Sequence, residues 1–288
     1  MGQQAQRTAR RRRLGSALRA AREAARVNTT DAAAAIHGDN TKISRVETGR
    51  HRLTRLELDT LLDLYEVTEK RTRERLVALA SEGRKKTWWC QYRDMLPGDF
   101  KESLTLESDT ARISVYQPQV VPGLLQTREY AKVVMTGSPD RVTDEELDFY
   151  LDFRMERQRI FDREKPPQYL CIIPEGVIRQ RVGGASVMAA QLRKLLAVSR
   201  PPAITIQIVP FSQTAFTCTG GAFNLYSYPD PMDLDVVHIS HLDSALSLEE
   251  DETVAKYRWV FESLRASALS AEQSVKLMTS IAEELEQE

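Results

Sequence analysis

The stretch from residue 40 to residue 48, NTKISRVET, interleaves hydrogen-bonding side chains with two apolar ones, Ile43 and Val46. Positions three apart in a helix share one face, so this spacing places the apolar pair on one side and polar groups on the other. Up to residue 45 the polar groups are an amide, two hydroxyls, an ammonium and a guanidinium: Asn40, Thr41, Ser44, Lys42 and Arg45. They hold no nucleophile with an adjacent base, so they indicate recognition of a surface rather than catalysis.

Charge is distributed unevenly along the 288 residues. Residues 1–86 carry 20 Lys and Arg against 11 Asp and Glu, a net charge of +9. Residues 87–288 carry a net charge of −10, so the whole chain is nearly neutral at −1. A basic N-terminal part joined to an acidic C-terminal part indicates a polyanionic partner for the first.

Five short helices are expected to position the polar stretch. Their predicted ranges are 14–26, an alanine-rich helix capped by Asn28 or Thr29, 40–48, 55–65 and 69–82. Asp39 is the expected N-cap of the third helix, and Gly49 is expected to end it. Residues 1–13 are expected to form a disordered basic arm, which either lies along phosphates or is a solvated tail.

The stretch from Leu14 to Val67 resembles the XRE (Cro/repressor-like) helix-turn-helix family, most closely in KISRVETGRHRLTRLELDTLLDLYEV. The resemblance implies a lambda-repressor-like, all-α DNA-binding domain over residues 14–83. Its third helix would enter the major groove of a double-stranded DNA operator. Because the family reads two half-sites, the resemblance also implies a homodimer.

The same resemblance assigns roles to individual residues. Base edges would face Asn40, Thr41, Ser44 and Arg45, with Arg45 suited to guanine and Asn40 to adenine. Phosphates would face Thr29, Lys42, Arg50, Arg52 and Arg55, although the family often has glutamine at the position of Thr29. A structural ion pair is implied between Arg22 and Glu47. The alternative is that these are solvated charges on an all-α bundle.

A connector at 84–87 is expected to lead into an α+β domain over residues 88–288, with a mostly antiparallel sheet. Strands are expected within ARISVYQPQVV, PPQYLCIIPEGVI, AITIQIVPF, AFNLYSY, DVVHISHL and SALSLEE. Helices are expected at TREYAKVVM and over 143–163, 186–199, 253–267 and 272–286, with a capping box of Thr143 and Glu146 on the second. The last helix carries an apolar stripe that packs either on its own domain or on a second copy: Val275, Met278, Ile281 and Leu285.

The motif VVPGLLQTREYA, residues 120–131, resembles a C-terminal domain found behind XRE units in actinobacterial regulators. The dipeptides WW and LE and the segment SALSAEQS also match, so the resemblance spans residues 88–274. Members are often described as antitoxin-like and are commonly paired with a small, separately encoded protein. The resemblance thus implies a transcriptional regulator whose C-terminal domain senses a small partner protein or ligand. The alternatives are an antitoxin-like component with autoregulatory DNA binding and an enzyme with a DNA-targeting head.

Catalytic, metal and nucleotide sites are not indicated, and no cofactor is expected. His238 and His241 would point to opposite faces of a strand, so with Asp243 they make a poor metal site. The segments 182–186 and 219–221 lack the pattern and lysine of a phosphate loop. Without G-x-S-x-G there is no nucleophile elbow, and we expect no enzyme.

The redox and membrane signals are weak. Three cysteines, Cys90, Cys171 and Cys218, are far apart and lack CxxC spacing, which argues against a disulfide framework and a zinc site. No apolar run approaches the roughly 18 residues of a membrane span, and no apolar segment follows the N-terminal arginines. We therefore expect a cytoplasmic protein without a membrane partner.

Overall fold

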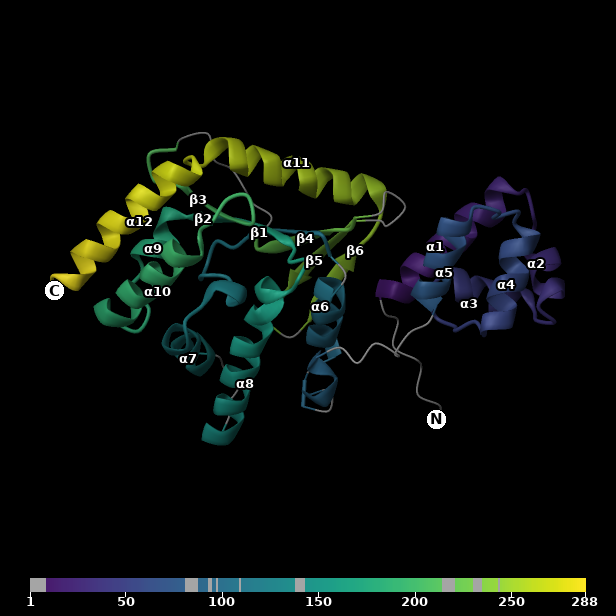
Figure 1. Ribbon diagram of the computed structural model, residues 1–288, viewed down its shortest axis with the longest axis horizontal. Coiled ribbons are helices and arrows are strands. Elements are labelled where there is room, and N and C mark those ends of the chain that lie inside the picture. Colours follow the sequence, from purple (N-terminus) through teal and green to yellow (C-terminus); the bar gives the residue numbers. More distant parts are fainter. Residues whose placement is uncertain are drawn as a thin grey trace. The chain divides into compact units, whose positions relative to one another are not determined.

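The computed structural model describes residues 9–80, 88–92, 95–96, 98–108, 110–137, 143–213, 221–229, 235–242 and 244–288. It divides into two compact units (Figure 1), one with the described residues up to 108 and one with those from 110 onward. The expected connector at 84–87 lies outside the described residues, as do Cys218 and Asp243.

The first unit is all-helical. Its helices are α1 (Ala9–Ala24), α2 (Thr29–Ala35), α3 (Asn40–Glu47), α4 (Arg55–Leu64) and α5 (Lys70–Ala80), followed by the 3-10 helix η1 (Trp88–Tyr92) and α6 (Gly98–Ser108). Leu18, Ile43, Leu58 and Leu76 are almost fully buried in a core shared by the first five helices. Helix α6 was not expected from the sequence, in which it has no clear amphipathic period.

Helix α1 begins at Ala9, so the expectation of an arm over 1–13 is wrong for residues 9–13. Arginine and alanine are strong helix formers, and they extend the helix backwards from Leu14. Arg11 and Arg13 are 7% exposed and belong to the packed part of the unit. Residues 1–8 of the expected arm lie outside the described residues.

The caps of α2 and α3 follow from short polar side chains. Asn28 Oδ1 accepts a hydrogen bond from the Asp31 amide, and Asp39 Oδ1 accepts one from the Lys42 amide. Both satisfy amides that have no partner inside their helix. Ala32 and Ala33 of α2 are buried, and their small side chains let this helix pack close to its neighbours.

The second unit is built on a six-stranded sheet in the order β3-β2-β1-β4-β5-β6. The strands are β1 (Arg112–Tyr116), β2 (Gln168–Pro174), β3 (Ile204–Val209), β4 (Phe223–Ser227), β5 (Val236–Ser240) and β6 (Ala245–Leu248). Strands β1, β2 and β3 pair in parallel, whereas the pairs β1–β4, β4–β5 and β5–β6 are antiparallel. The predicted α+β class with a mostly antiparallel sheet is confirmed.

The helices of this unit are α7 (Arg128–Thr136), α8 (Asp144–Arg157), α9 (Glu175–Arg179), α10 (Ala185–Val198), α11 (Asp251–Ser267) and α12 (Ala271–Glu286). Short 3-10 helices η2 (Gly123–Leu125) and η3 (Gln158–Asp162) complete it. The capping box of Thr143 and Glu146 is present, but α8 ends at Arg157 rather than continuing to 163. None of the helices in the described part of the chain is long and apolar enough to cross a membrane.

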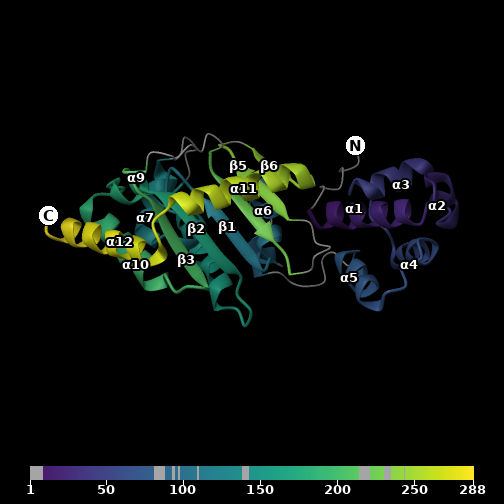
Figure 2. The ribbon, with the colours of Figure 1, turned by 90° about the horizontal axis from the view of Figure 1, so that it is seen from above.

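Helices cover both faces of the sheet. Helix α11 lies across the strands on one face (Figure 2), and α7, α8 and α10 lie on the other side (Figure 1). Phe261 and Leu264 of α11 are buried against Phe223 and Val237 of the sheet. In α12, Met278, Ile281 and Leu285 are buried and the helix packs on α10, so the stripe serves its own unit.

Candidate nucleic-acid interface

Helix α3 separates its apolar and polar residues as its sequence predicted. Ile43 and Val46 are 1% and 3% exposed, and they fix the helix to the core. The four side chains assigned to base edges are all exposed: Asn40, Thr41, Ser44 and Arg45. The exposed face of α3 is therefore a row of hydrogen-bonding groups on a firmly seated helix.

The Arg45 side chain has no hydrogen-bond or ion-pair partner among the described residues, so its donors are available to a ligand. Its main-chain carbonyl accepts from the amides of Arg50 and His51, at 2.6 and 3.1 Å, which ties the following turn to the end of α3. Asn40 Nδ2 donates to Thr30 Oγ1 at 3.2 Å and joins the starts of α3 and α2.

Most residues assigned to phosphates lie near the ends of these helices. Arg50 and Arg52 are exposed in the turn after Gly49, whose φ of +71° ends α3. Arg55 is exposed at the start of α4 and pairs with Asp59, with 2.7 Å between Nε and Oδ2. Thr29 is the first residue of α2 and is partly buried.

Lys42 differs from the other residues assigned to phosphates because the counter-charge of its ammonium group is partly buried and belongs to another helix. Nζ lies 2.5 Å from Glu57 Oε1, and the two side chains are 24% and 19% exposed. Glu57 also closes the capping box of α4 with Thr54. Partial burial raises the pKa of Glu57, but hydrogen bonds from Lys42 and Thr54 outweigh it and hold that pKa below its usual range. Lys42 thus links α3 to α4.

Substituting Lys42 should therefore affect the fold more than DNA contacts. We expect Lys42→Met to lower the free energy of unfolding by about 1 kcal/mol, the upper end for a partly exposed pair. The loss should vanish at low pH, because the depressed pKa of Glu57 makes the pair stabilising only while the carboxylate is ionised. Urea unfolding at several pH values measures this, with Glu57→Gln as the matched variant. A lower salt dependence of DNA binding in Lys42→Met would instead indicate a phosphate contact.

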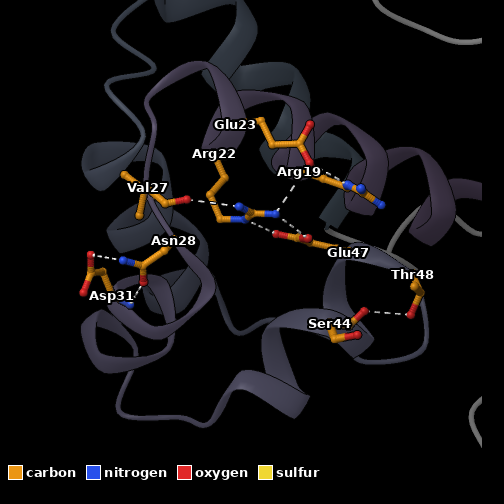
Figure 3. A network of polar contacts seen from close by, with 9 residues as sticks. All are labelled: Arg19, Arg22, Glu23, Val27, Asn28, Asp31, Ser44, Glu47 and Thr48. Atoms are coloured by element: carbon orange, nitrogen blue, oxygen red, sulfur yellow. Dashed lines mark hydrogen bonds and ion pairs between the residues drawn. The ribbon is translucent and has the colours of Figure 1, made fainter.

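The structure brings Arg22 and Glu47 together (Figure 3). Arg22 Nε donates to Glu47 Oε1 at 2.6 Å, and a second guanidinium nitrogen donates to Oε2 at 3.0 Å. A third donates to the Val27 carbonyl at 3.0 Å, so one arginine joins α1, the α1–α2 turn and the end of α3. The two side chains are 11% and 9% exposed. The hydrogen bond with Glu47 raises the pKa of Arg22, and burial beside the Glu47 carboxylate raises that of Tyr65 to about 12.

Two glycines let the backbones of α1 and α3 approach each other. A Cβ atom on Gly15 would lie 2.4 Å from the Glu47 carbonyl oxygen and 2.5 Å from that of Val46. A Cβ atom on Gly49 would lie 2.8 Å from the Arg12 amide nitrogen. The sequence reasoning assigned no role to Gly15; the available signal was a glycine inside a run of strong helix formers.

Family models match both units of the chain. Residues 13–76 match the model of a helix-turn-helix domain, and residues 100–280 match that of a domain of unknown function (DUF5753). No match was found among curated proteins or among solved structures. The helix-turn-helix match includes α3 and its exposed polar face. It identifies the kind of domain that DNA-binding regulators use.

Proposed function

Since the chain belongs to the DUF5753 family and carries a helix-turn-helix domain of DNA-binding regulators, we propose that it is a sequence-specific transcriptional regulator of the XRE type. The observation that carries the proposal is the division of α3 into two faces. Its polar face is exposed, and its apolar face is buried in the core. A helix of this kind fits the major groove, where each base pair offers its own pattern of donors and acceptors.

Each exposed residue then has a stated task. Arg45 is the reader of guanine, because a guanidinium without a protein partner is able to bond O6 and N7 together. Asn40, Thr41 and Ser44 face neighbouring bases. Arg50, Arg52 and Arg55 bind phosphates, and the net charge of +9 on residues 1–86 supports that role. We leave Lys42 out of the contact set because its pair with Glu57 is partly buried, whereas Arg55 pairs with Asp59 at the surface and its side chain is 68% exposed.

Arg45→Ala and Arg52→Ala should weaken DNA binding in different ways. Arg45→Ala should cost about 1–3 kcal/mol on the specific operator and relax the preference at one base pair. Arg52→Ala should weaken binding to all sequences and reduce the slope of log K against log salt by about 0.9. Fluorescence anisotropy at several salt concentrations and footprinting measure both, with exposed Arg71 of α5 as a control substitution. Unchanged affinity and footprint in Arg45→Ala would remove α3 from the interface.

We further propose that the protein binds as a homodimer, because one helix-turn-helix buries little surface. Two readers would then contact half-sites about 34 Å apart, one turn of DNA. The same footprint tests this, since a dimer protects a palindrome. A monomer in light scattering with an asymmetric footprint would contradict it.

The DUF5753 domain is proposed as the input module, which binds a small partner protein or ligand and changes operator affinity. Its support is the size of the acidic part, with a net charge of −10 over residues 87–288. Thermodynamic linkage requires that if the partner changes the affinity of the protein for the operator, the operator changes the affinity of the protein for the partner by the same factor. Partner affinity measured with and without operator therefore tests it. An antitoxin-like role remains the alternative, and a toxin gene next to this gene would favour it.

A further inference from the structure

The VPGLLQT segment, residues 121–127, forms a loop whose backbone is held by side chains from three helices. Gln158 Nε2 donates to the carbonyls of Gly123 and Gln126, at 3.1 and 2.8 Å. Gln191 Nε2 donates to the Leu125 carbonyl at 2.8 Å, and its Oε1 accepts from the Thr127 amide at 2.7 Å. The Tyr130 hydroxyl accepts from the Val121 amide at 3.2 Å. These bonds make the loop a rigid platform on α7, η3 and α10.

Arg154 of α8 lies against this loop without an acidic partner among the described residues. NH1 donates to Gln126 Oε1 at 2.5 Å, and the guanidinium lies against Gly123. Several other arginines of the unit pair with carboxylates, as Arg179 does with Glu175 and Arg193 with Glu286, although the exposed Arg112 donates to the neutral Gln168. Arg154 is partly exposed, and Gln126 is its one hydrogen-bond acceptor among the described residues.

Lys194 of α10 adds a second cation to the same loop. Nζ donates to the Gln126 carbonyl at 2.7 Å and to Gln158 Oε1 at 2.5 Å, which are both uncharged acceptors. Desolvation lowers the pKa of Lys194, and the negative charge of Glu129 opposes this shift only in part. Desolvation and the nearby Arg157 charge lower the pKa of Arg154 to about 10, so it stays charged at neutral pH. A partly buried cation whose hydrogen-bond partners are all neutral lacks a counter-charge to offset its desolvation.

We propose that Arg154 and Lys194 form a binding site for an oxyanion, the carboxylate or phosphoryl group of a small effector. The guanidinium has an unused edge of N–H donors that fits two oxygens, and the ammonium has one further donor. The rigid loop fixes both cations before the ligand arrives. The site would supply the ligand chemistry of the proposed input module, but oxyanion binding itself does not depend on the DNA-binding function.

Binding of simple probes to the full chain tests the proposal. Inorganic phosphate and citrate, each titrated against sodium chloride of equal ionic strength, should bind saturably in calorimetry and raise Tm. Arg154→Gln and Lys194→Gln should each weaken binding by at least about tenfold, the factor expected for one lost charge-assisted hydrogen bond. Arg159→Gln is the matched control, because Arg159 is exposed and pairs with Glu156.

Two results would overturn the site: no saturable binding of either probe, or equal binding by the two variants and the wild-type chain. A preference for phosphate identifies a phosphoryl group, and a preference for citrate identifies a carboxylate. If Arg154→Gln does not fold, the comparison of probe binding by Lys194→Gln and by the Arg159→Gln control decides whether the site exists. Operator affinity is measured in a separate experiment. A failure of the DNA-binding proposal can therefore be told apart from a failure of the oxyanion site.

Discussion

Glu47→Ala should lower the free energy of unfolding of the helix-turn-helix unit by about 3 kcal/mol, the lower end for a broken buried ion pair. Arg22 is only 11% exposed, and the substitution leaves it the Val27 carbonyl as hydrogen-bond acceptor and the exposed Glu23 carboxylate, 3.8 Å away, as counter-charge. The cost therefore comes mainly from a poorly compensated buried charge and not from the lost attraction. Urea unfolding of the full chain, followed by circular dichroism, measures the change.

The double variant Arg22→Met/Glu47→Leu separates these two contributions. It removes both charges, so it should recover most of the stability that Glu47→Ala loses. Arg19→Ala is the matched control, since Arg19 pairs with Glu23 at the surface, where the side chains are 62% and 54% exposed, and its loss should not be measurable. A double variant no more stable than Glu47→Ala would count against a buried pair.

Gly15→Ala should destabilise the same unit by about 3 kcal/mol, the upper part of the usual range for overpacking. The sign of this effect is informative. Within an unobstructed helix, alanine is more favourable than glycine by about 1 kcal/mol, so the substitution would otherwise stabilise α1. Here the new methyl group meets backbone carbonyl oxygens of Glu47 and Val46 at about 2.5 Å, and backbone atoms do not move aside as a side chain does.

Gly38→Ala is the control for this prediction. A Cβ atom there would meet the Lys42 side chain, with Cδ at 3.0 Å, and that flexible chain is able to shift. Thermal unfolding of the two variants should therefore differ clearly, and Gly15→Ala should also lose operator affinity because α1 seats α3. A stable Gly15→Ala with normal DNA binding would show that α1 and α3 do not pack as closely as the structure has them.

Local features of this chain were readable from its sequence because they depend on neighbouring residues. The apolar pair Ile43 and Val46 identified the buried face of α3, and Asp39 identified its start. Alternation in segments such as AITIQIVPF located strands, and Thr143 with Glu146 located the start of α8. The ion pair of Arg22 and Glu47 was implied only by family resemblance. The start of α1 was misplaced because a basic run resembles a solvated arm whether or not it is helical.

Contacts between distant residues were decided only by the tertiary structure. Lys42 looked like another phosphate ligand until α4 placed Glu57 beside it, fifteen residues away. Gly15 acquired its role from the backbone of α3, and Arg154 met Gln126, 28 residues away, through packing of α8 on the VPGLLQT loop. Periodicity specifies which face of an element is buried but not which element covers it. Most of the elements, though not α6 or the start of α1, and the exposed face of α3 were therefore predictable from local sequence, whereas the fold decided which charges are paired and which remain available to a ligand.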